Sequence, residues 1–298
     1  MANNATANFT DMITPVTSEV LFEEYNRRPH IFSRLFNVQH SKRNSEIDSQ
    51  LIGFSAAPEK PEGTAVNYEG AVQGYDTTYA HVSYGKGFRI TKEMQQDDLT
   101  GKMMKLPRAL GTSMHNTVET VSHNLFINGF ATATGGDGSS LFASDHTPAS
   151  GGADQSNILS TAADLSATSL KDALVAFEDT NDDRGLPLLQ NATTLLVPSG
   201  LRYTAQELLK SKQKPGSADN DFNPLAEADL GWMISQYLTD ADAWFLIGDI
   251  HFLKFMWRQE PEFDSTPDFD TGDAKFKLTS RFSVGHSDWR GVYGTPGA

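Results

Sequence analysis

The residues best suited to bind a metal ion fall in one short stretch beyond the middle of the chain. Asp179, Asn181 and Asp183 place oxygen-bearing side chains at alternate positions, the spacing typical of the start of a calcium loop. The glycine that such a loop needs, Gly185, lies one position late, and Gln190 occupies the twelfth position, where a bidentate glutamate belongs. The pattern therefore favours a solvated turn, with a calcium-dependent hydrolase as an alternative function.

A second set of residues could supply nucleophilic or acid–base chemistry. Ser144 precedes Asp145 and His146, but neighbouring residues of an extended chain point to opposite faces and cannot form a relay by themselves. His115 and His123 are too far apart in sequence for one ion to reach both easily, so we expect them on a helix surface. No glycine–x–serine–x–glycine elbow, Walker loop or dinucleotide fingerprint is present. We therefore expect no catalysis, cofactor or metal ion.

The strongest periodic signal predicts a long helix over Leu106–Ala133. Pro107 suits its first turn, and Gly135 with Gly136 would end it. Many of its residues are weak helix formers, so packing must stabilise it. We expect it to serve as a spine for a sheet and a second domain. Its apolar residues recur at helical spacing and fall on one stripe: Leu110, Met114, Val118, Val121 and Leu125.

Two segments before this helix have too little apolar sequence for cores of their own. Residues 1–50 consist of short amphipathic pieces, which we interpret as an arm. Residues 51–84 alternate in side-chain character around Thr64–Tyr68 and Tyr79–Tyr84, with prolines and glycines between, and are predicted to form an extended hairpin. Because isolated two-stranded ribbons are marginal in water, the hairpin must be stabilised by contacts elsewhere.

Helix and strand signals alternate in the rest of the chain, which indicates an α+β fold. Ser169 and Asp172 form a possible capping box ahead of an amphipathic helix. Leu195–Val197 and Ala243–Ile247 are apolar throughout and predict buried strands. Further strands are predicted over 231–238, 251–259 and 274–284.

Composition excludes several classes of function. The 298 residues include no cysteine, which rules out disulfides and thiolate metal sites. No apolar run approaches the roughly 20 residues of a membrane span, and the N-terminus does not resemble a signal peptide. The net charge is −14, and residues 135–298 hold 24 acidic against 12 basic side chains. Such a surface repels nucleic acid, which argues against sequence-specific binding of DNA or RNA.

The order of these parts, together with several short motifs, resembles the major capsid proteins of tailed bacteriophages. These proteins share the Hong Kong 97-type capsid fold, and the similarity is greatest to the Mu-like major head subunits. It covers essentially the whole chain. The motifs are Asp137–Phe142 with Asp145 and His146, Leu196–Pro198, Ala243–Leu246 and Asp288–Gly294.

The resemblance implies five segments. They are an N-terminal arm over 1–50, an extended loop hairpin over 51–84, a peripheral domain with the spine helix over 85–134, an apical domain over 135–248, and return strands of the peripheral domain over 249–298. Such a subunit is structural: it self-assembles as hexamers and pentamers into an icosahedral shell enclosing double-stranded DNA. The virion would be its location, after assembly in the host bacterial cytoplasm.

Partners also follow from the resemblance. A portal protein is expected, and so is a separate scaffold or maturation protease, because some relatives carry an N-terminal scaffolding segment that this sequence lacks. A cellular nanocompartment shell related to the encapsulins would share the fold but enclose a cargo enzyme. The hairpin offers candidate contacts to neighbouring subunits: Tyr68, Tyr75, Tyr79, Tyr84, and Lys60, which invites comparison with relatives that crosslink through a lysine.

Overall fold

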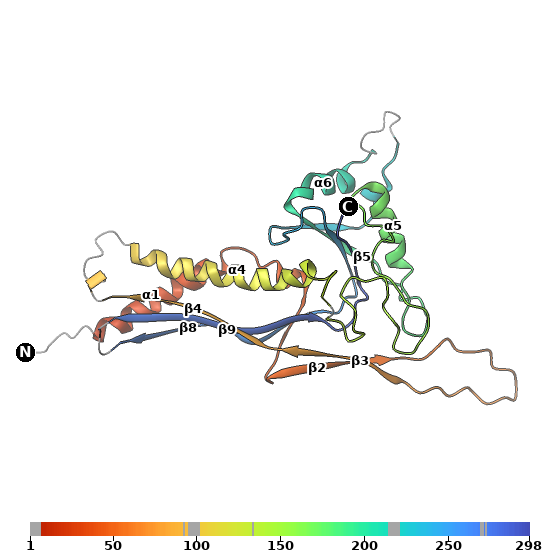
Figure 1. The fold of residues 1–298 in the computed structure, drawn as a ribbon, viewed down its shortest axis with the longest axis horizontal. Coiled ribbons are helices and arrows are strands. Elements are labelled where there is room, and N and C mark those ends of the chain that lie inside the picture. The colour runs from red at the N-terminus through yellow and green to blue at the C-terminus, as the bar shows by residue number, and fades with distance from the viewer. Residues whose placement is uncertain are drawn as a thin grey trace, which may run out of the picture.

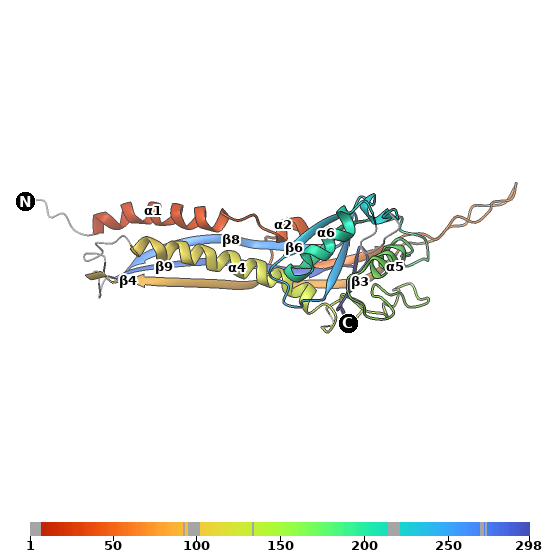
Figure 2. The ribbon, with the colours of Figure 1, turned by 90° about the horizontal axis from the view of Figure 1, so that it is seen from above.

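A computed structural model describes residues 7–298 apart from 92, 95–101, 133, 214–220, 269–270 and 272. The molecule is elongated: a long helix lies along one sheet, a second sheet with two helices stands at one end, and a hairpin projects beyond it (Figures 1 and 2). Among the described residues, no helix is both long and apolar enough to cross a membrane.

The first sheet has the strand order β1-β8-β9-β4. β8 and β9 form its long antiparallel centre, β4 pairs antiparallel with β9, and β1 runs parallel to β8. One face of β9 is buried through Phe276, Leu278 and Ser280, whereas Lys277 on the other face is exposed. The strands are β1 (Asn37–His40), β4 (Val82–Ile90), β8 (Leu253–Pro267) and β9 (Ala274–His286).

The predicted spine is α4 (Lys105–Ile127), which lies over this sheet beside α1 (Ala7–Asn26) (Figure 2). At its 23 residues it is about 34 Å long. α1 comes so close that a Cβ on Gly111 would lie 2.5 Å from the Leu21 carbonyl oxygen. A short helix, α2 (Phe32–Leu35), follows α1 and also contacts α4.

Two details of the spine differ from the sequence prediction. The helix ends at Ile127, where Gly129 packs against the Phe142 ring, and the chain continues in turns; Ala133 lies outside the described residues. His115 and His123, expected on the surface, are 4% and 0% exposed because α1, α2 and the second domain cover the helix on more than one side. Of the predicted stripe, Leu110, Met114 and Val118 are buried, whereas Val121 and Leu125 are half-buried.

The second sheet has the order β10-β7-β5-β6 and is covered by α5 and α6. The predicted buried strands are confirmed, since Leu195–Val197 and Trp244–Ile247 are at most 4% exposed. β10, near the C-terminus, pairs with β7, so the chain returns to this sheet at its end. The elements are α5 (Ala167–Glu178), β5 (Ala192–Pro198), α6 (Arg202–Lys210), β6 (Gly231–Ser235), β7 (Trp244–Gly248) and β10 (Val292–Thr295).

The capping box of α5 lies one turn before the predicted position. Ser166 is the N-cap, and its side chain accepts from the Ser169 amide at 3.2 Å, while the Ser169 hydroxyl accepts from the Ser166 amide at 2.9 Å. Asp172 therefore has no capping role, because the helix has already begun at Ala167.

The projecting hairpin consists of β2 (Ser45–Ile52) and β3 (Val72–Ala80), paired antiparallel from Ser45↔Ala80 to Ile52↔Val72. The strand predicted around Thr64–Tyr68 is wrong: these residues lie in the connection, and the first strand comes from the segment interpreted as the arm. Residues 53–71 join the two strands without regular structure and extend to the far end of the molecule (Figure 1).

Candidate assembly surface and the junction at its base

The connection over residues 53–71 is the least covered part of the described chain. Every residue from 53 to 68 is exposed, including three large apolar or aromatic side chains: Phe54 at 59%, Val66 at 50% and Tyr68 at 88%. Glu69 ties the connection to the rest of the chain by pairing with Arg184 at 3.3 Å, and it also accepts hydrogen bonds from Ser55 within the connection. A segment of this kind has no core of its own and is suited to cover another molecule.

The apolar surface continues along the paired strands and at the end of β4. Ile47 is 65% exposed, Leu51 76%, Val72 48% and Val82 51%. Ile47 and Leu51 take exposed positions in the alternating pattern of β2, whereas Val72 pairs with the buried Ile52 and Val82 begins β4. The hairpin therefore presents apolar groups over most of its length.

The structure separates the four candidate tyrosines. Tyr68 is exposed at the connection, as is Lys60. Tyr75 is half-buried and donates a hydrogen bond to the Thr147 carbonyl at 3.2 Å. Tyr84 is half-buried and stacks on Phe282 with ring centroids 4.8 Å apart, and burial raises the pKa of its hydroxyl. Three of these four side chains keep some free surface.

Tyr79, in contrast, lies inside its own chain at 3% exposure. Its hydroxyl is 2.6 Å from the Ser287 hydroxyl, and its ring fills the space left by Gly285, where a Cβ would lie 2.9 Å from the ring. Burial raises the pKa of this hydroxyl. Tyr79 thus anchors the hairpin to β9, and it has no surface to offer a neighbour in this conformation.

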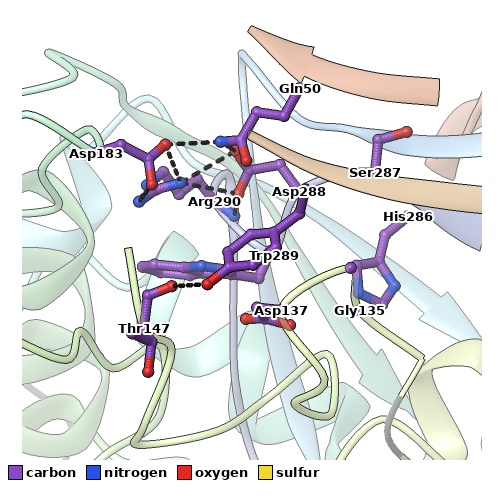
Figure 3. Close-up of a pocket in the computed structure, with 12 residues that line it drawn as sticks. Gln50, Gly135, Asp137, Thr147, Asp183, His286, Ser287, Asp288, Trp289 and Arg290 are labelled. Carbon is purple, nitrogen blue, oxygen red and sulfur yellow. Dashed lines mark hydrogen bonds and ion pairs between the residues drawn. The ribbon is translucent and has the colours of Figure 1, made fainter. Parts of the chain in front are cut away.

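A buried arginine joins the hairpin to both other parts of the molecule (Figure 3). Arg290 is 4% exposed, and its guanidinium pairs with Asp183 at 3.3 Å and Asp288 at 3.1 Å. Its Nε donates to the Asn181 carbonyl at 2.9 Å. Gln50 of β2 donates to the same two carboxylates, at 2.7 and 3.1 Å. We refer to Gln50, Asp183, Asp288 and Arg290 as the junction.

The junction requires a glycine beside it. Gly291 has φ +88, and a Cβ there would lie 2.1 Å from the Ile250 carbonyl oxygen, so no other residue fits. The motif Asp288–Gly294 was visible in the sequence, but the role of Arg290 was not. Its partner Asp183 is 107 positions away, and no local pattern links the two residues.

The calcium-like stretch lies in a turn, but the expectation of a solvated turn is wrong, because the Asp183 side chain is only 8% exposed. The Asp183 carboxylate is occupied by Arg290 and Gln50. Oδ1 of Asp182 accepts from the Arg184 and Leu186 amides at 2.8 Å each, and Gly185 has φ +79. An ion at Asp183 would therefore have to displace the Arg290 guanidinium, whereas Asp182, which is not part of the calcium-like spacing, closes the turn.

The Asp145–His146 motif does not form a relay with Ser144. Ser144 and Asp145 are exposed, whereas the His146 ring is buried and stacks on Trp289 with centroids 4.3 Å apart. Its Nδ1 lies 2.6 Å from Oδ2 of Asp137. Burial alone would raise the pKa of Asp137, but the hydrogen bonds from His146 and the Ser139 amide bring it below its ordinary value. This pair fixes the loop after α4.

The cavity between the junction and this pair is small. It has a volume of about 20 Å³ and is lined by His286 and Gly135 as well as by the junction (Figure 3). A space of this size holds about one water molecule and no organic substrate. The junction and this pair together fix three segments of the chain to one another.

His286 makes the stability of this region depend on pH. Its side chain is 2% exposed, and burial lowers its pKa from 6.5 to about 4. The folded chain keeps it neutral, whereas the unfolded chain binds a proton near pH 6.5. The stabilisation is therefore full above pH 6.5 and is lost as the pH falls towards 4. We expect a loss of about 2 kcal/mol between pH 7 and pH 5.

Urea unfolding of the wild type and of His286→Gln at the two pH values would measure this contribution. The variant should lose about 2 kcal/mol less than the wild type over the same interval. His40→Gln is the matched control, because the His40 side chain is 66% exposed. Equal pH dependence in the wild type and His286→Gln would show that the histidine is not held neutral.

Comparisons with known proteins agree with this geometry. The family described as phage capsid protein matches residues 74–295. A chain from Microbacterium phage Oxtober96 superposes with a TM-score of 0.60 at 10% identity, covering 90% of this chain and 91% of that one. The capsid of bacteriophage JBD30 gives 0.57 at 15% identity, covering 71% and 92%.

A virus-like particle from Pyrococcus furiosus has a TM-score of 0.55 at 8% identity, covering 94% of this chain and 97% of its own. A comparison with curated protein sequences finds no match. At these identities the structural likeness concerns the fold alone.

Proposed function

This chain belongs to the phage capsid protein family and has the Hong Kong 97-type capsid fold, and on that premise we propose that it is the major head subunit of a tailed phage. In this proposal it forms hexamers and pentamers that close into an icosahedral shell around double-stranded DNA. The observation that carries the proposal is the hairpin. Residues 53–68 are exposed and have no core in their own chain, yet their base is fixed by a buried junction.

The segment boundaries follow from the same reasoning. We assign residues 1–50 to the arm, 51–84 to the hairpin, 85–134 and 249–298 to the peripheral domain, and 135–248 to the apical domain. The structure adds that β2 extends the hairpin back to Ser45, and that β10 contributes to the apical sheet. Among capsid subunits we place the chain nearest to the Mu-like head proteins, on the order of its motifs.

The role we assign is structural and not enzymatic. The groups most able to do chemistry near the junction are held in ion pairs or hydrogen bonds with one another. The proposed partners are a portal protein and a separate scaffold or protease, with assembly in the bacterial cytoplasm and residence in the virion.

Electron microscopy tests the proposal directly. The chain, purified after co-expression with its proposed scaffold, should form closed particles of uniform size. A chain that stays monomeric under those conditions would contradict the proposal. Particles that contain a co-purifying enzyme and no DNA would favour a nanocompartment, the alternative suggested by the virus-like particle from Pyrococcus furiosus.

We expect the shell to enclose packaged DNA without binding it tightly. The net charge of −14 makes the surface repel phosphate, and several basic side chains of the first sheet are already paired with carboxylates. Purified subunits should bind duplex DNA no more tightly than the 10⁻⁴–10⁻⁶ M typical of non-specific contacts at physiological salt. Fluorescence anisotropy would measure this, and tight, salt-sensitive binding would contradict it. The pairs are Arg89–Asp273, Lys254–Asp48, Lys275–Asp268 and Lys277–Asp264.

A further inference from the structure

A cluster of possible metal ligands, of which His115 and Glu119 are buried and His30 is half-buried, lies where the N-terminal segment meets the spine helix. His115 and Glu119 are one turn apart on α4, and His30 reaches them from the link between α1 and α2. One potential ligand atom from each residue lies within 4.8 Å of the other two. We propose that these three side chains bind one zinc ion, which fastens the N-terminal segment to the spine.

The hydrogen bonding of His115 leaves one ring nitrogen available to a metal. Its Nδ1 lies 3.1 Å from the Tyr25 carbonyl oxygen. A carbonyl only accepts, so Nδ1 carries the proton and Nε2 keeps a free lone pair. Histidines that bind metals usually donate their other ring N–H to a carbonyl or carboxylate in this way.

Glu119 is a buried carboxylate that is already oriented. Its side chain is 0% exposed, and its two oxygens accept from the Ile31 and Phe32 amides at 2.8 and 3.2 Å. Each oxygen retains a second lone pair, so these bonds do not prevent metal binding. Hydrogen bonds from outside the site are the usual means by which a ligating carboxylate is held in place.

His30 supplies an observation that the hydrogen bonds of Glu119 with the Ile31 and Phe32 amides do not explain. Its Nδ1 is buried and has no hydrogen-bond partner, although it lies 3.5 Å from Oε1 of Glu119. Two ligands of a tetrahedral zinc ion, each at about 2.0–2.1 Å, are separated by about 3.3–3.4 Å. The histidine nitrogen and the carboxylate oxygen are thus spaced as the edge of such a site. An ion between them would satisfy the unpaired nitrogen.

The donor set selects the class of ion. Two neutral imidazoles and one carboxylate suit zinc, whereas calcium and magnesium require oxygen ligands throughout. Three protein ligands leave the fourth position to a water molecule. The segment that carries His30 lies 85 positions from His115 along the chain. Bound zinc would therefore stabilise the tertiary contact between the N-terminal segment and α4.

Zinc titration of the full-length chain, without an affinity tag and after treatment with a chelator, tests the proposal. The wild type should bind one zinc ion per chain and melt at a higher temperature with zinc than without it. Cobalt(II) in place of zinc should give the intense visible absorption of a tetrahedral site. His30→Asn should weaken zinc binding at least about 100-fold and abolish the thermal shift.

His40→Asn is the matched control, because His40 also lies near a glutamate, with 3.7 Å between His40 Nε2 and Glu260 Oε1, but its side chain is 66% exposed. This variant should bind zinc as the wild type does. His115→Gln provides a second test of the site. Absence of stoichiometric binding by the wild type would overturn the proposal, and so would binding that His30→Asn leaves unchanged or that His40→Asn weakens equally.

Discussion

Replacement of residues 56–68, which include Val66 and Tyr68, by a short glycine–serine link is expected to leave a subunit that folds normally but builds no stable shell. These residues are exposed, and the paired strands end at Ile52 and Val72, outside the replaced stretch. The clasp between Ser55 and Glu69 is also retained. Urea unfolding of the isolated subunit should therefore match the wild type, whereas sedimentation of the assembled product should show no shells.

The contact free energy that the replacement removes follows from the apolar area that the hairpin can cover on a neighbouring subunit. An aromatic side chain such as Tyr68 that buries about 100 Å² contributes roughly 2.5 kcal/mol at 25 cal/mol per Å². This is an upper figure, since docking also orders a free segment. Each subunit of a shell would lose such contacts at once, so the effect on assembly is large.

A single substitution tests whether the Tyr68 side chain itself contributes to the contact between subunits. Tyr68→Ser should lower the temperature at which particles disassemble, while Tyr203→Ser, which changes a tyrosine on α6 that is 72% exposed, should not. Particles of normal heat resistance formed by the loop replacement would refute the assembly role. An unfolded subunit would show that residues 56–68 are needed for folding.

Arg290→Gln is expected to cause the largest loss of stability of any single substitution considered for this chain. Its guanidinium is 4% exposed and bridges two carboxylates whose side chains are 8% and 11% exposed. Removal of the cation leaves both anions buried without their partner, which costs about 3–5 kcal/mol. Urea unfolding at neutral pH would measure the loss.

The control is Arg27→Gln, which breaks an exposed pair with Glu24 and should cost less than about 1 kcal/mol. Arg290→Gln combined with Asp288→Asn should recover part of the loss, because the second change removes one uncompensated charge. A loss below 1 kcal/mol for Arg290→Gln would mean that the junction does not hold the hairpin to the rest of the subunit.

Local periodicity predicted the helices and the buried strands well. The hydrophobic patterns of the spine and of the strands around Leu196 and Phe245 each lie within one element, so the local sequence is enough to recognise them. The hairpin register could not be predicted, because β2 is largely polar and Thr64–Tyr68 alternates equally well. What distinguishes Ser45–Ile52 from Thr64–Tyr68 is its pairing with β3, which joins residues far apart in sequence, such as Ser45 and Ala80.

The candidate sites also depend on contacts between residues far apart in sequence. His115 was expected on the helix surface because it lies too far from His123 for the two to share a metal ion, but it is buried against the Tyr25 carbonyl, which is 90 positions away. Tyr79 was expected to contact another subunit, but it packs on Gly285 and Ser287 of its own chain. Burial and partners of this kind are set by tertiary contacts, which no local pattern contains.

A cryo-electron microscopy reconstruction of the assembled particle tests the central claim most directly. It should show residues 53–71 of each subunit lying across a neighbouring subunit, with Tyr68 in contact with that neighbour and the junction around Arg290 intact. A closed shell in which this segment folds back on its own chain, or extends into solvent at every position, would contradict the account.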